Sequence, residues 1–152
     1  MIQLPNGQHM IESMAIIYHL VEENSGLIPK PGTDGRKLFH QYMSFLSSSF
    51  YPTILLLYHP DQYVSKDNEP DLKEKSTNIL NTYLNFIESK LDPYLCGDEI
   101  TAADYYFFMI IGWYEELENL NCYPKISEII NIMSKNQTII NVKNKQNERE
   151  KE

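Results

Sequence analysis

The chain has 152 residues, of which 42% are hydrophobic and 12% aromatic, and it carries a formal net charge of −8. A chain of this length suits one domain with a sizeable core. The negative charge argues against nucleic acids and anionic membranes as partners, because both favour surfaces rich in Lys and Arg.

The first part of the chain predicts two short strands and a helix. Residues 1–4 and 8–11 contain apolar side chains and flank Asn6-Gly7, a pair typical of tight hairpin turns. Over residues 12–23 apolar side chains recur at helical spacing, and Asn24-Ser25-Gly26 is expected to end this helix.

A linker and two long helices are predicted next. Residues 27–35 are rich in Pro and Gly, which is typical of a connecting loop. Helical spacing of apolar residues predicts a helix over 34–58, and Pro52 should kink it because proline cannot donate a backbone hydrogen bond. After a polar loop over residues 61–71, the pattern of residues 71–91 predicts a second long helix, antiparallel to the first.

The strongest local signal is a capping box that begins a helix at Thr101. Its side chain can accept a hydrogen bond from the N–H of Asp104, and the Asp104 carboxylate can bond back to the N–H of Thr101. Residues 105–113 are apolar or aromatic on nearly every face, so we expect a buried central helix from Thr101 to about Glu116.

The end of the chain predicts two more helices and a tail. Pro124 fits the first turn of a helix whose apolar positions continue to Met133. A short helix is predicted over 138–142. Residues 143–152 are almost all charged or amide-bearing, so we expect a disordered tail.

The remaining composition indicates a cytoplasmic protein without a metal site. Cys96 and Cys122 do not form a Cys-x-x-Cys motif, and we expect both to be reduced. We see no secretory signal, and the longest apolar runs fall far short of the ~20 residues that span a membrane. Metal-ligand spacing is not found among the four histidines, which are His9, His19, His40 and His59.

Three segments carry a resemblance to a known family. They are the runs NGQHMIESMAII at residues 6–17, CGDEITAAD at 96–104 and YPKI at 123–126. The first resembles the end of the thioredoxin-like domain of glutathione S-transferases, especially bacterial ones. The other two resemble the capping-box region and the penultimate helix of that family's helical domain.

The resemblance covers residues 1 to about 145 and implies a mainly all-α fold. Residues 36–142 would form an all-helical bundle like the C-terminal domain of a glutathione S-transferase. Residues 1–26, a β-hairpin and a helix, would be the remnant of its thioredoxin-like, glutathione-binding domain, joined by the linker 27–35.

Glu12 and Ser13 are the candidate glutathione-binding residues. The N-terminus of a helix favours anions, so the N–H and hydroxyl of Ser13 could bind a ligand carboxylate, while Glu12 could pair with an ammonium group. The γ-glutamyl end of glutathione carries both charges, and the resemblance implies this role. The alternative is that the two residues only cap the helix.

The resemblance also implies an acceptor pocket for an apolar electrophile, next to bound glutathione. By position this pocket would be lined by four aromatic residues, namely Tyr51, Tyr58, Tyr106 and Trp113. The alternative for each of them is simple packing in the core or at an interface.

Two functions remain open. The first is a glutathione S-transferase-like protein, which would conjugate the thiol of glutathione if the missing N-terminal half were present. The family's thiol-activating residue precedes the matching segments, so no catalytic residue is assigned. The alternative is a non-catalytic helical module for dimerisation or partner binding. Family members usually dimerise, and residues 19–23 and 36–50 would form the homodimer interface.

Overall fold

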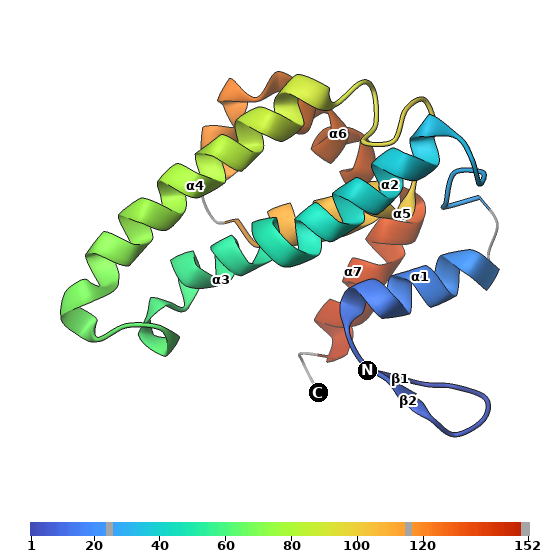
Figure 1. Cartoon of the computed structure of the whole chain (residues 1–152), viewed down its shortest axis with the longest axis horizontal. Helices are drawn as coiled ribbons and strands as arrows, with labels where there is room; N and C mark the ends of the chain where they lie inside the picture. The colour runs from blue at the N-terminus through green and yellow to red at the C-terminus, as the bar shows by residue number, and fades with distance from the viewer. Residues whose placement is uncertain (24–25, 115–116, 150–152) are drawn as a thin grey trace.

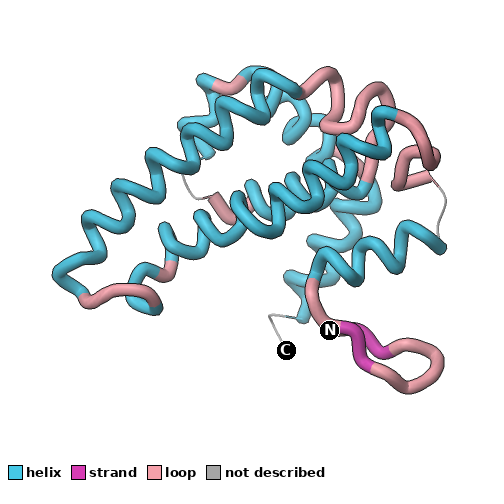
Figure 2. The backbone as a smooth tube through the Cα atoms, in the orientation of Figure 1, coloured by secondary structure: helices cyan, strands magenta, loops and turns pink. Residues whose placement is uncertain are grey.

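The computed structural model describes residues 1–23, 26–114 and 117–149. A small hairpin and a first helix stand beside a bundle of helices, as Figures 1 and 2 show. The strands are β1 (Ile2–Gln3) and β2 (His9–Met10). The α-helices are α1 (Ser13–Glu23), α2 (Asp34–Phe45), α3 (Tyr51–Tyr58), α4 (Glu69–Lys90), α5 (Ala102–Ile111), α6 (Pro124–Ser134) and α7 (Gln137–Arg149).

The hairpin and the helix after it are confirmed. In the antiparallel pair, Ile2 lies opposite Met10 and Gln3 opposite His9. The expected stop of α1 at Asn24-Ser25 lies outside the described residues. Within the described part of the chain, the sheet has only these two strands, so each presents an unpaired edge.

The long predicted helix over residues 34–58 is confirmed, but it is not uniform. Between α2 and α3 lies a π-helical segment, η1 (Leu46–Phe50), where the Tyr51 N–H bonds to the carbonyl of Leu46. It ends two residues before Pro52, whose ring cannot accommodate a regular α-helical turn on its N-terminal side. Figure 1 shows α2, η1 and α3 lying alongside α4, which runs in the opposite direction.

The loop predicted over residues 61–71 is shorter than expected. It contains two 3₁₀ turns, η2 (Pro60–Gln62) and η3 (Lys66–Asn68), and α4 begins at Glu69. Pro70 occupies the first turn of α4, where its missing N–H removes no helical hydrogen bond.

The capping box forms at the start of α5, and this helix is central to the core. Phe107 and Ile110 are fully buried, and the ring centroids of Phe107 and Phe50 are 5.8 Å apart. We expected nearly every face of this helix to be buried, but the face that carries Met109 is not, because Met109 is 42% exposed. Helix α5 also ends at Ile111 rather than near Glu116, a residue outside those described; Gly112 follows as its C-cap.

The final helix is longer than predicted. Helix α7 runs to Arg149, so residues 143–149 are helical where we expected a disordered tail. Lys, Gln, Glu and Arg in this stretch are good helix formers, and neither Pro nor Gly interrupts them. The Lys143 ammonium also lies over the ring of Phe108, 5.1 Å from its centroid.

Candidate functional site

The candidate glutathione-binding residues lie at the exposed N-terminus of α1. Glu12 has a φ of 69°, a left-handed backbone conformation that residues other than glycine seldom adopt. Its carbonyl accepts the first helical hydrogen bond, from the Ile16 N–H at 3.0 Å. The N–H groups of residues 13–15 therefore have no acceptor within the helix and are suited to an anion.

Helix α1 is fixed against the bundle by contacts from α2 and η1. The Ser47 hydroxyl donates to the sulfur of Met14, 3.3 Å away. The rings of Tyr18 and His40 stack with centroids 5.7 Å apart, and a 2.9 Å hydrogen bond joins the Tyr18 hydroxyl to His40 Nδ1. These contacts set the position of the N-terminus of α1 relative to the helical bundle.

Two of the four predicted acceptor-pocket residues, Tyr51 and Trp113, lie together. The ring centroids of Tyr51 and Trp113 are 5.6 Å apart, with their planes tilted by 51°. Burial raises the pKa of Tyr106, and the nearby charges of Tyr51 and Glu12 raise it further.

Tyr58 lies at the opposite end of α3 from Tyr51. It ends α3, whereas Tyr51 begins the same helix. Seven residues of α-helix correspond to a separation of about 10 Å along the axis. Exposure also divides the group, since Tyr106 is only 5% exposed and Trp113 is 48% exposed.

A groove between α5 and α7 was not found by sequence reasoning. Its volume is about 510 Å³, and it shares only Trp113 with the predicted acceptor pocket. The sequence does contain a pattern that could have predicted this groove, because the lining side chains recur at helical spacing on both α5 and α7. The lining side chains include Tyr105, Phe108 and Met109 from α5 and Ile139, Val142 and Lys143 from α7.

Other kinds of site can be assessed only within the described residues. There, no cluster of three or more His, Cys, Asp and Glu side chains could hold a metal ion. No described helix is long and apolar enough to cross a membrane. Neither Cys96 nor Cys122 is in a disulfide.

Comparison with known families identifies the helical part. The family model described as the glutathione S-transferase C-terminal domain matches residues 32–129, well over half of the chain. An uncharacterised GST-like protein of Escherichia coli (strain K12), YncG, is 26% identical over 112 residues, which cover 72% of this chain and 54% of that protein. The chain thus spans about half the length of this curated relative.

Solved structures share the whole arrangement. A glutathione transferase homologue from Sulfitobacter, with bound glutathione, has a TM-score of 0.83 and 20% identity, covering 95% of this chain and 81% of the other. BphK, a bacterial glutathione S-transferase in a ternary complex, has a TM-score of 0.80 and 26% identity, covering 92% of this chain and 70% of the other. With its helical domain matched by the family model and its fold shared with these structures, the chain belongs to the glutathione S-transferase family.

Proposed function

We propose that this chain contributes to a glutathione-binding site of a glutathione S-transferase-like protein. In this proposal residues 1–26 are part of a thioredoxin-like domain, 27–35 are the linker and 36–142 are the helical domain. The observation that carries the proposal is the left-handed Glu12 at the start of α1. Strained backbone of this kind persists where the surroundings require it, and it is concentrated at functional sites.

The charges of the γ-glutamyl group would match the start of α1. Its carboxylate would accept hydrogen bonds from the N–H and hydroxyl of Ser13, and its ammonium would pair with Glu12. Both side chains are exposed and face no competing ion pair in the described part of the chain. The N-terminal dipole of α1 adds to the attraction for the carboxylate.

We propose that an apolar electrophile binds beside this position. Tyr51, Tyr106 and Trp113 would cover its apolar body and exclude water from the glutathione thiol, with Tyr58 about two helical turns further along α3. No residue of this chain is assigned to activating the thiol. Conjugation, and with it a role in detoxification, therefore needs a thioredoxin-like segment that supplies the activating residue and pairs with the exposed strand edge.

We also propose a homodimer in the cytoplasm. Leu20 on α1 and Leu38 on α2 are 46% and 36% exposed, and they fall within the segments 19–23 and 36–50 expected at the interface. Burying such side chains would favour association. Two cysteines outside any disulfide fit a reducing compartment.

Calorimetric titration with glutathione tests the binding site. We expect the chain to bind glutathione, and we expect Ser13→Ala and Glu12→Gln each to weaken binding about tenfold, the effect of one lost charge-assisted hydrogen bond. Ser89→Ala is the matched control, because Ser89 lies on α4 and, among the described residues, its hydroxyl bonds to the local carbonyl of Phe86 alone.

The same titration should be repeated with a thioredoxin-like half from a bacterial relative supplied in trans. Absence of binding in both settings would contradict the proposal and favour a non-catalytic helical module. Equal affinities for the Ser13 and Glu12 variants and the parent would show that the two residues only cap α1.

A further inference from the structure

A second cavity lies where α4 faces the segment that follows α5. Its volume is about 440 Å³, within the usual range for small-molecule sites. Leu84 and Leu120 are buried apolar side chains in its wall, and Tyr114 is also buried. None of these residues belongs to the proposed glutathione or acceptor site.

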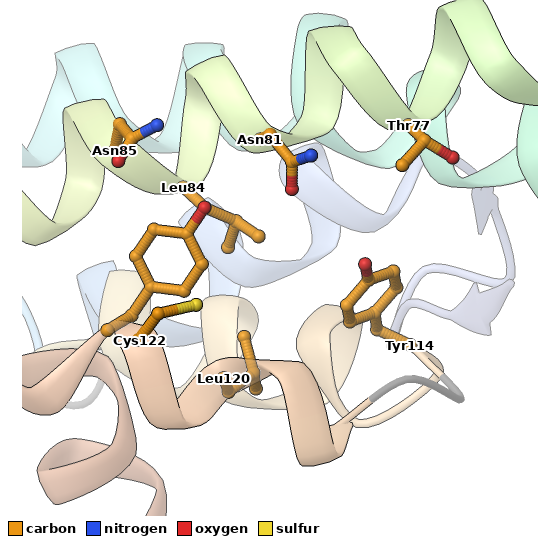
Figure 3. Close-up of a pocket in the computed structure, with 8 residues that line it drawn as sticks. Thr77, Asn81, Leu84, Asn85, Tyr114, Leu120 and Cys122 are labelled. Atoms are coloured by element: carbon orange, nitrogen blue, oxygen red, sulfur yellow. The ribbon is translucent and has the colours of Figure 1, made fainter.

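The α4 side of the cavity is a row of uncharged polar side chains. Thr77, Asn81 and Asn85 follow one another at intervals of four residues and so share one face of α4. Figure 3 shows this row above the cavity, with the Tyr114 hydroxyl directed toward α4 from the opposite side. Within the described residues, the amides of Asn81 and Asn85 form no hydrogen bond, so both remain available to a ligand.

The chemistry of the lining favours a neutral ligand. The eight lining residues that belong to the described part of the chain are uncharged, and the chain as a whole is strongly acidic. Because none of these eight described residues is a cation, a phosphate or carboxylate would lose its hydration beside them without compensation. An asparagine amide offers a donor and an acceptor side by side, which is the pattern that pairs with the edge of a nucleobase.

We propose that this cavity binds a neutral planar heterocycle whose edge carries an adjacent hydrogen-bond donor and acceptor, such as a nucleobase or nicotinamide. The ring lies against Leu84, Leu120 and the tyrosine rings, and its polar edge pairs with Asn81 and Asn85. The site is separate from glutathione binding and does not depend on it.

The chain provides its own reporter of occupancy. Cys122 is exposed and lines the cavity, whereas Cys96 is buried and its pKa is raised by burial to about 11. A thiol reagent at pH 8 should therefore modify Cys122 and spare Cys96, because the thiolate is the reactive form. A ligand in the cavity should slow this modification.

The test is calorimetric titration with adenosine, cytidine and nicotinamide, combined with the rate of Cys122 alkylation. We expect at least one probe to bind and to slow alkylation, and we expect Asn81→Leu and Asn85→Leu to weaken its binding about tenfold. Asn78→Leu is the matched control, since Asn78 is exposed on the same helix outside the cavity. AMP should bind more weakly than adenosine.

Three results would overturn the proposal. One is absence of binding by all three probes. Another is binding without protection of Cys122, which would locate the ligand elsewhere. The third is equal binding of indole, which is planar but lacks the paired donor and acceptor.

Discussion

The Asp104 carboxylate accepts a hydrogen bond from the Leu95 N–H, 2.9 Å away, across the loop that leads into α5. The other carboxylate oxygen accepts from the N–H and the hydroxyl of Thr101, at 2.7 and 2.8 Å. One fully buried side chain thus closes the capping box and also fixes the preceding loop.

Removal of this carboxylate should destabilise the whole fold. We expect Asp104→Ala to lower the free energy of unfolding by about 2–3 kcal/mol, because it leaves buried N–H donors unpaired. Thr101→Ala should cost about 1 kcal/mol through loss of the cap. Thermal unfolding measures both, with the exposed Asp98→Ala as control. Parent-like melting of the Asp104 variant would contradict this role.

The same group predicts a pH dependence of stability. Burial raises the pKa of Asp104 above its ordinary value of 3.8, and the hydrogen bonds from Leu95 and Thr101 offset this only in part. The folded chain therefore holds the proton more tightly than the unfolded chain. The contribution of Asp104 to the free energy of unfolding should be largest below pH 3.8 and should decrease as the pH rises through the raised folded-state pKa.

Urea unfolding of the parent and Asp104→Asn between pH 3 and 7 checks this expectation. Asparagine does not titrate, so the difference between the two free energies of unfolding isolates the ionisation of Asp104. The parent should lose stability relative to the variant as the pH rises. A difference that is independent of pH would show that the hydrogen bonds fully offset burial, and one that grows in the parent's favour would show that they outweigh it.

Glu88 forms a cap between two helices. Its carboxylate on α4 accepts hydrogen bonds from the N–H groups of Lys125 and Ile126 in the first turn of α6, both at 3.0 Å. We expect Glu88→Ala to lower the free energy of unfolding by about 1–2 kcal/mol. Glu88→Gln should cost less, since it keeps one acceptor. The exposed Glu128→Ala is the control in denaturant titrations, and an equal effect of the two alanine variants would refute the cap.

Two neighbouring side chains on α5 should respond very differently to truncation. Phe107 is fully buried, so Phe107→Ala should lower the free energy of unfolding by about 3–5 kcal/mol through the cavity that it leaves. Met109 is partly exposed, so Met109→Ala should cost about 1 kcal/mol or less. Chemical denaturation compares the pair directly. Similar costs would mean that α5 is not oriented as described.

Local signals explain why much of the fold could be predicted. The hairpin turn at Asn6-Gly7 and the box between Thr101 and Asp104 each lie within a few residues, and the hydrogen bonds that form them involve the same neighbours. Contacts distant in sequence could not be predicted in this way. Glu88 caps a helix that begins 36 residues later, a pairing that no pattern within α4 indicates.

The candidate sites likewise combine local features, which the sequence predicts, with contacts between distant residues, which it does not. The resemblance placed Glu12 and Ser13 at a helix start, and the backbone strain at Glu12 became visible only in three dimensions. The pairing of Tyr51 with Trp113 depends on how α3 and α5 pack, which aromatic character alone does not predict. The polarity of residues 143–149 predicts disorder, whereas their helix propensity predicts the helix that the structure contains.

The π-helical segment η1 between α2 and α3 limits which insertions and deletions this part of the chain can tolerate. A π turn holds one more residue than the α-helix that it replaces, and each residue turns an α-helix by about 100°. Loss of one serine from Ser47–Ser49 would therefore convert the π turn into a regular α-helical turn and place Pro52 inside it, where its ring clashes with the carbonyl four residues before it. Point substitutions in the three serines should be tolerated more readily than a change in their number.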